Sequence, residues 1–325
     1  MKKILIIRYG AIGDVVHTSN IFRSIKAAHP DYRVDYLTAP VPAQILKNNP
    51  LINNVFELKS KDYYTLLKFA QKFRKERYDL IINLQPSLRF RFLTMMSMPK
   101  DVVVYHKDGR LHAVENFFLT AKKVMPELEN PADLKLEISK DIIENVKKQL
   151  PDFSGRKLVI VNVCTSPTRH GRKWPFDYFK KLITSLIERY NCVVLLPGAK
   201  ENIEEIKYFE NMHPDVHIIA GKFSLVESAA VFSLCDVFIS GDTGPLHIAT
   251  AFEKPVCIGL YGAAPVCRTG PYGAKHFTVA SNLSCAPCSL RNCTKKEFAK
   301  EEINPCMTSI IPDDVISLIN DNKLL

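Results

Sequence analysis

The sequence predicts an α/β protein with two similar domains, each built on a parallel sheet that helices cover. In the first half, a continuous apolar run at residues 3–8 indicates a strand buried on both faces, and a Gly/Asp turn and a helix follow it. In the second half, residues 237–250 repeat this order with a β-branched run, a Gly-Asp-Thr-Gly turn and a helix that Pro245 would open. Because strands and helices alternate along the chain, we expect a parallel sheet in each half.

The remaining elements follow the same alternation. In the first half we expect strands at residues 34–38, 54–58 and 80–84 and helices at 14–28, 64–76 and 139–150. The segment 151–155 then marks the boundary, which gives an N-terminal domain of residues 1–155 and a C-terminal domain of residues 156–325. In the second half we expect strands at 157–163, 192–197, 216–220, 237–240 and 255–260. We expect helices at 175–190 and 201–212 and further helices that begin at 225 and 245. A terminal helix at 312–320 would pack on the first domain.

Composition narrows the class of protein. At 325 residues, the chain is long enough for two domains of about 150 residues each. The amino terminus is too weakly apolar for a signal peptide, and no segment has eighteen consecutive apolar residues, so we expect a cytoplasmic protein with reduced cysteines unless they hold metal. The net charge of +10 suggests a negatively charged partner: nucleic acid, an anionic membrane surface or an acidic small molecule.

Two turns are candidates for ligand binding. Gly10 and Gly13 permit a tight turn before Asp14, but their spacing is not that of a dinucleotide fingerprint, which weakens a nicotinamide interpretation. In the second half, Asp242 and Thr243 are good helix caps, and the free amides of the new helix offer a seat for a phosphate. An ordinary strand-to-helix turn with a capping Asp is the alternative.

Other candidates lie at strand ends. Lys173 and its neighbour Arg172 stand just before a helix, where a pyrophosphate would sit, although a solvated basic loop is the alternative. Arg89 and Arg91 follow a strand end and offer charge for an anionic substrate, unless they are ordinary surface arginines. Ser224 and Glu227 match a capping box, which by itself accounts for the glutamate.

Four of the nine cysteines form a cluster in the segment 285–306. They are Cys285, Cys288, Cys293 and Cys306, and the first pair has the spacing of metal ligands. A structural zinc or iron, reduced thiols and disulfides all remain open. The other five cysteines lie in or near apolar runs and are expected in the core.

Several motifs together resemble glycosyltransferase family 9, the ADP-heptose:lipopolysaccharide heptosyltransferases. In chain order they are Gly10-Ala-Ile-Gly-Asp14-Val-Val-His17, Arg172-Lys-Trp-Pro175, Leu225-Val-Glu227, Gly241-Asp-Thr-Gly-Pro-Leu-His247 and Lys254-Pro-Val. The resemblance implies a GT-B fold, in which two Rossmann-like domains face each other across a cleft. The first domain would bind mainly the acceptor and the second the sugar nucleotide.

The resemblance also implies roles for individual residues. Asp14 would be the general base that deprotonates the acceptor hydroxyl, and Lys173 would neutralise the departing diphosphate without a divalent metal. Donor contacts are implied for Gly13, Glu227, Asp242, Thr243, Gly244 and His247. Acceptor contacts are assigned to Arg89, Arg91 and His112. No catalytic cofactor is expected, and a structural zinc or iron would sit only at the cysteine cluster.

The implied substrates are ADP-heptose and an acidic glycolipid of the lipid A–Kdo type at the cytoplasmic face of the inner membrane. A positively charged enzyme would be peripheral to that membrane. No nucleic-acid partner is expected. The alternatives are a family member that uses another sugar nucleotide or a protein acceptor, an inert sugar-nucleotide-binding module, and a basic nucleic-acid-binding protein with a zinc cluster.

Overall fold

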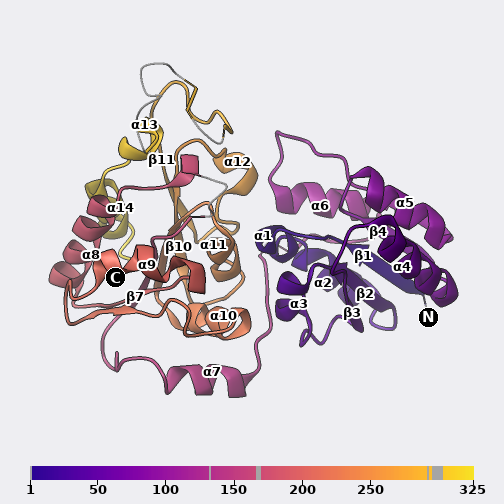
Figure 1. Cartoon of the computed structure of the whole chain (residues 1–325), viewed down its shortest axis with the longest axis horizontal. Coiled ribbons are helices and arrows are strands. Elements are labelled where there is room, and N and C mark those ends of the chain that lie inside the picture. Colours follow the sequence, from indigo (N-terminus) through magenta and orange to yellow (C-terminus); the bar gives the residue numbers. More distant parts are fainter. Residues whose placement is uncertain (1, 132, 166–169, 291–292, 295–302) are drawn as a thin grey trace. The chain divides into compact units, whose positions relative to one another are not determined.

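The computed structural model describes residues 2–131, 133–165, 170–290, 293–294 and 303–325, which form two compact units (Figure 1). Unit 1 is Met1–Glu137 and unit 2 is Ile138–Leu325. The boundary therefore lies before the helix α7 (Lys140–Lys147), whereas the sequence placed it after this helix. The reason is that α7 packs against α10 (Leu225–Leu234), which belongs to unit 2.

Unit 1 contains a parallel sheet of five strands in the order β3-β2-β1-β4-β5. These strands are β1 (Lys3–Ile7), β2 (Arg33–Thr38), β3 (Asn54–Glu57), β4 (Leu80–Asn83) and β5 (Asp101–Val104). The four strands expected in this half are present, whereas β5 was not predicted. That strand is a four-residue edge strand with two exposed positions, so it lacks the long apolar run that marks β1.

Helices cover both faces of this sheet because the side chains of β1 alternate between two cores. Leu5 and Ile7 pack with α4 (Tyr63–Glu76) and α5 (Leu88–Ser97), whereas Ile4 and Ile6 pack with α1 (Ile12–Val16), α2 (Ser19–Ala28) and α6 (Ala113–Lys122). The single helix expected at residues 14–28 is thus two helices. A further helix, α3 (Pro40–Leu46), follows β2.

Unit 2 repeats the topology of unit 1 with one more strand. The order of its parallel sheet is β11-β10-β9-β6-β7-β8. The strands are β6 (Leu158–Asn162), β7 (Val193–Leu196), β8 (Val216–Ile218), β9 (Val237–Gly241), β10 (Val256–Tyr261) and β11 (Phe277–Ala280). In both units the chain first forms the strands from one central strand out to one edge of the sheet. It then returns to the neighbouring central strand and forms the strands out to the opposite edge. In open α/β sheets, ligands bind at such a reversal point, which here lies at the carboxyl ends of β6 and β9.

The helices of unit 2 surround this sheet. Besides α7 and α10, they are α8 (Phe176–Tyr190), α9 (Ile203–Ile206), α11 (Gly244–Ala249), α12 (Val266–Thr269), α13 (Pro305–Thr308) and α14 (Pro312–Asp321), with 3-10 turns at His170–Arg172, Lys200–Asn202 and Lys207–Phe209. The helix expected at 201–212 is therefore broken into short segments. The terminal helix α14 packs against α8 in its own unit, where the buried Trp174 donates to the Ile310 carbonyl at 2.9 Å. Within the described residues, no helix is both long and apolar enough to span a bilayer.

Candidate active site

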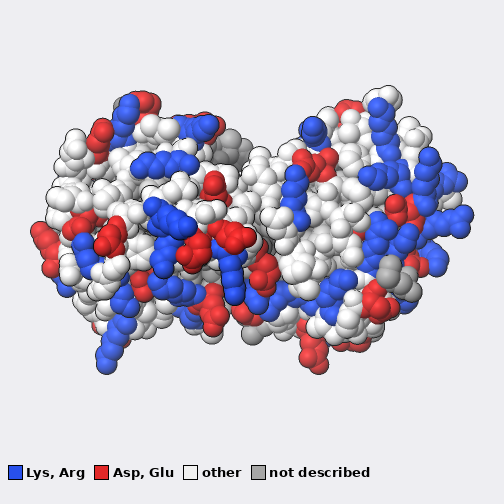
Figure 2. Space-filling view, turned by 90° about the horizontal axis from the view of Figure 1, so that it is seen from below, with Lys and Arg blue, Asp and Glu red and all other residues white. Residues whose placement is uncertain are grey.

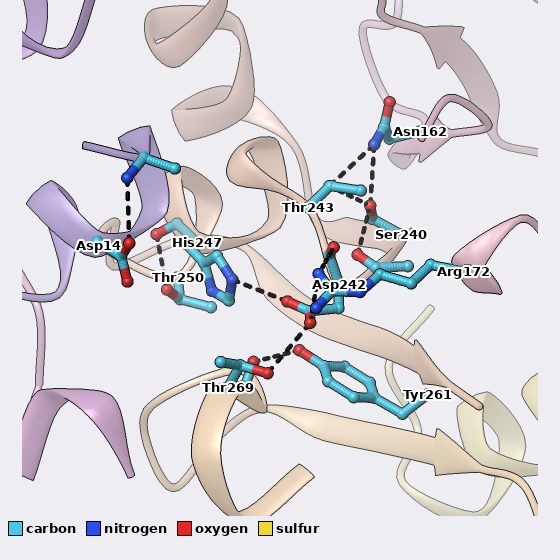
Figure 3. A network of polar contacts seen from close by, with 12 residues as sticks. Asp14, Asn162, Arg172, Ser240, Asp242, Thr243, His247, Thr250, Tyr261 and Thr269 are labelled. Atoms are coloured by element: carbon cyan, nitrogen blue, oxygen red, sulfur yellow. Dashed lines mark hydrogen bonds and ion pairs between the residues drawn. The ribbon is translucent and has the colours of Figure 1, made fainter. Parts of the chain in front are cut away.

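The carboxyl ends of the two central strands of unit 2 form a polar junction (Figure 3). Asn162 of β6 lies beside Ser240 of β9, and its Nδ2 donates to the Ser240 hydroxyl at 2.9 Å and to the Thr243 hydroxyl at 3.1 Å. The Ser240 and Thr243 hydroxyls are themselves 2.9 Å apart. Thr243 is the N-cap residue of α11, but its side chain does not cap the helix because these neighbours hold it. The turn before α11 is thus fixed from two strands.

Asp242 is the centre of a second network at this junction. Its side chain is almost fully buried, and its Oδ2 accepts from Arg172 at 2.6 Å and from the Thr269 hydroxyl at 3.1 Å. His247 of α11 places Nε2 3.2 Å from Oδ1. Arg172 also donates to the Asp242 carbonyl at 2.8 Å. The network therefore ties the loop before α8, the β9–α11 turn and α12 together.

The electrostatics of Asp242 follow from these contacts. Burial acts to raise the pKa of Asp242, but the hydrogen bond and charge of His247, the Arg172 guanidinium and the Thr269 hydroxyl outweigh it and hold the pKa below its ordinary value. Tyr261 of β10 adds a fixed group nearby, since its hydroxyl donates to the Thr269 carbonyl. Asp242 is therefore a buried carboxylate that links three segments at the carboxyl end of the sheet.

Lys173 is directed away from the Asp242 network, although it follows Arg172 directly. Its Nζ lies 3.0 Å from the Glu205 carboxylate and 4.7 Å from the centre of the Phe176 ring. Both charged groups of this pair are about one-third exposed, so solvent competes with the pair. The ammonium group can therefore exchange Glu205 for another anion at low cost. Residues 166–169 of the preceding loop lie outside the described residues.

Glu227 occupies the capping position that the sequence predicts at the start of α10. Its Oε2 accepts from the Ser224 N–H at 2.8 Å, and its own N–H donates to the Ser224 hydroxyl at 3.3 Å. The Ser224 backbone and hydroxyl together lower the pKa of Glu227. Of the two capping contacts, one uses a carboxylate oxygen, Oε2, and the other uses the backbone N–H.

In unit 1, Asp14 lies in the short helix α1, next to Gly13. Arg8 donates to its Oδ2 at 2.6 Å, and the Ala11 N–H donates to the same oxygen at 3.0 Å. Arg8 is anchored in turn by the Leu84 carbonyl at 2.7 Å and by the Phe117 ring at 4.9 Å. Within the described part of the chain, Oδ1 of Asp14 makes no hydrogen bond. The carboxylate is thus oriented through one of its two oxygens.

The three predicted acceptor residues divide between the two faces of the first sheet. His112 caps α6 by accepting from the Val114 N–H at 3.2 Å, and its ring lies 5.5 Å from that of His17, the residue that ends α1. His112 therefore lies on the same face as Asp14. Arg89 and Arg91 are exposed on α5, which covers the opposite face.

The four clustered cysteines gather around one small cavity of about 30 Å³ in unit 2. All nine cysteines are free thiols. Burial and the neighbouring thiols at 288, 285 and 293 raise the pKa of Cys306 to about 11. Among the described residues, no group of three or more His, Cys, Asp or Glu side chains meets the geometry of a metal site. Part of this segment, at 291–292 and 295–302, lies outside the described residues.

Four further residues of these networks escaped the sequence analysis. Arg8 follows the apolar strand β1, and Asn162 is the last residue of the apolar strand β6. A single polar side chain at the end of an apolar run was the only sequence signal that could have marked them as site residues. Ser240 belongs to the β-branched run and Thr269 ends the short helix α12, so neither stands out from its neighbours in the sequence. The pairing of Arg172 with Asp242 was also missed, because the two are 70 residues apart.

Comparison with known proteins adds to this geometry. The family described as glycosyltransferase family 9 (heptosyltransferase) matches residues 66–299. The lipopolysaccharide core heptosyltransferase OpsX of Haemophilus influenzae is 24% identical over 92% of this chain and 88% of its own length.

Two solved structures match nearly the whole chain. ADP-heptose lipopolysaccharide heptosyltransferase II of E. coli has a TM-score of 0.80 and 20% identity, and the match covers 100% of this chain and 99% of that one. E. coli heptosyltransferase WaaC, solved with ADP, has a TM-score of 0.74 and 19% identity over 98% of this chain and 99% of its own. These structures confirm the expected GT-B class, with two Rossmann-like parallel sheets.

Proposed function

Because the chain belongs to glycosyltransferase family 9, we propose that it is an inverting glycosyltransferase that moves heptose from ADP-heptose to the inner core of lipopolysaccharide. The observation that carries this proposal is the Asp242 network at the reversal point of the second sheet, where α/β folds bind nucleotides. Relatives of similar length that are named as heptosyltransferases support the choice of sugar.

The donor would be held by unit 2. The turn that Asn162 and Ser240 fix presents the amides of Thr243 and Gly244, which would donate to the diphosphate oxygens. Lys173 would leave Glu205 and pair with the diphosphate, where its charge helps most as the leaving group becomes more negative. Glu227 has one carboxylate oxygen outside its capping bonds and would accept from the nucleotide ribose. Asp242 and His247 would shape the wall of the pocket, and Gly13 would allow close approach of the donor.

The chemical step would use Asp14. Its Oδ1 would take the proton from the acceptor hydroxyl, and the hydroxyl oxygen would form the new bond to the anomeric carbon. The bond from that carbon to the diphosphate oxygen would break at the same time, and the electron pair would leave with ADP. Arg8 supports this role because it orients the carboxylate through Oδ2 and leaves Oδ1 without a hydrogen bond among the described residues. Attack opposite the leaving group inverts the configuration.

The acceptor would be an acidic glycolipid of the lipid A–Kdo type at the cytoplasmic face of the inner membrane. Its acidic groups would pair with Arg89, Arg91 and His112, and the net charge of +10 favours a peripheral enzyme at an anionic surface. The wide separation of α5 from α6 across the sheet suggests that the arginines and the histidine bind different groups of the acceptor.

A structural zinc or iron at Cys285, Cys288, Cys293 and Cys306 is a further part of the proposal. The four residues line one cavity, although their thiols would have to converge further to bind a metal. Metal analysis of the full chain purified under reducing conditions should find about one equivalent of zinc or iron, which Cys288→Ser removes. The matched control is Cys267→Ser, since this exposed thiol lies outside the cluster. A protein without metal would contradict the proposal.

A thermal-shift screen of nucleotide sugars tests the donor. At a concentration one hundred times its Kd, ADP-heptose should stabilise the protein by about 2.7 kcal/mol, which corresponds to a rise of about 5–10 °C in Tm. UDP- and GDP-sugars should give much smaller shifts. Selective stabilisation by another nucleotide sugar would identify that sugar as the donor in place of ADP-heptose. Stabilisation only by an oligonucleotide would contradict the glycosyltransferase proposal.

A further inference from the structure

Helix α5 exposes an unusual set of side chains for a surface helix. Its exposed residues are Leu88, Arg89, Arg91 and Met95, and the next exposed residue is Met98, which ends the helix. Leu88 is 78% exposed, Met95 67% and Met98 62%. The positions 88, 91, 95 and 98 share one face of a helix, so an apolar stripe with a single arginine faces solvent along about 15 Å. A surface helix normally places polar residues there.

The stripe continues onto neighbouring elements. An open groove of about 790 Å³ joins Leu88, Met95 and Met98 to Val102 of the edge strand β5. On the other side, the ring of Tyr63 in the first turn of α4 lies 5.3 Å from the ring of Phe92, which also lines the groove. Tyr63 is itself more than half exposed. We call this continuous surface the α5 face, made up of Tyr63, Leu88, Arg89, Arg91, Met95, Met98 and Val102.

Positive charge predominates on the two helices that carry the α5 face. The helices α4 and α5 together carry six Lys and Arg residues and one carboxylate, Glu76, which Lys3 and Arg33 neutralise. The groove contains one carboxylate, Asp101, whose Oδ1 accepts from the Val102 N–H. Beside it, Lys100 pairs with Asp79 at 2.6 Å. Figure 2 shows many Lys and Arg side chains, with a few Asp and Glu among them, on the right-hand part of unit 1.

We propose that the α5 face docks on an anionic lipid bilayer, with its Leu, Met and Tyr side chains in the headgroup region and its arginines on lipid phosphates. Apolar residues flanked by Lys and Arg are the pattern of surface-bound interfacial helices. Charge argues against a second copy of the chain as the occupant, because a symmetric contact would bring Arg89 and Arg91 of both copies together. The proposal rests on the proposed function and deepens it, since it names the surface by which a peripheral enzyme would meet the membrane, and its test needs neither donor nor acceptor.

Cosedimentation of the full chain with vesicles tests the docking surface. The protein should bind vesicles of phosphatidylcholine with phosphatidylglycerol and should not bind vesicles of phosphatidylcholine alone. Met95→Gln with Met98→Gln should lower the partition coefficient by at least about tenfold, since both apolar side chains are lost from the interface. Arg89→Gln with Arg91→Gln should lower it about 25-fold, or about fivefold for each charge.

Two matched controls separate the surface from bulk properties. Lys147→Gln with Lys148→Gln removes the same charge from exposed positions of unit 2, and Leu119→Gln removes a partly exposed apolar side chain from α6. Both should bind vesicles nearly as well as the wild type, and thermal unfolding should show that all variants fold. Equal loss in the control and α5 variants would overturn the proposal, as would binding to neutral vesicles or no binding at all. An α5 face that captures an acidic protein but no vesicles would overturn it too. A failure here leaves the ADP-heptose thermal shift unaffected, so the two proposals fail separately.

Discussion

Replacing Arg172 with glutamine tests how the Asp242 network is held together. The substitution removes the 2.6 Å ion pair to the carboxylate and the 2.8 Å hydrogen bond to the Asp242 carbonyl, while His247 and Thr269 keep their contacts. Loss of one partner from a buried ion pair costs about 3–5 kcal/mol. Because the Arg172 side chain is 23% exposed and two partners of Asp242 remain, we expect a loss somewhat below this range, about 2–3 kcal/mol, and a fall in Tm of about 5–10 °C.

The pH dependence of this loss gives a sharper test. Asp242 has a folded pKa below its unfolded value of 3.8, so its contribution to stability is present above that value and is lost as pH falls through the folded pKa. The stability difference between wild type and Arg172→Gln, measured by urea unfolding, should therefore be constant near neutral pH and shrink below the unfolded pKa. The control Lys173→Gln removes an exposed pair and should cost at most about 1 kcal/mol. A variant as stable as the wild type, or a difference that does not change with pH, would refute the reasoning.

Three predictions concern the proposed reaction. Asp14→Asn should lower kcat by about 100-fold or more, because the amide cannot take the proton from the acceptor hydroxyl. Calorimetry should find a nearly unchanged affinity for ADP. ADP release at the wild-type rate would show that Asp14 is not the base. Lys173→Ala should lower kcat/KM for the donor by about tenfold or more, since the departing diphosphate loses a positive charge, and an unchanged value would assign that charge to another residue. Turnover in excess chelator should equal that in buffer, and a loss that magnesium restores would contradict metal-free chemistry.

Local sequence patterns were enough to predict most of the fold. Apolar runs such as that of β1, and the Gly/Asp turns after them, carry their signal within a few residues, so strands and turns could be placed before the structure was known. Features with weak local signals, namely the strand β5 and the boundary between the two units, were not predicted correctly. The edge strand β5 is short and half exposed, and the boundary depended on which unit α7 packs against.

The sequence by itself determined the duplicated α/β plan, the family and the candidate residues Asp14 and Asp242, because each of these depends on neighbours in the chain. Only the tertiary structure decided which partner each charged group takes. Strand order brings Asn162 beside Ser240, 78 positions further along, and loop packing brings Arg172 to Asp242 while sending Lys173 to Glu205. The physical reason is that a buried polar group needs a hydrogen-bonding partner, and the partner available to it depends on which distant strands the sheet places side by side.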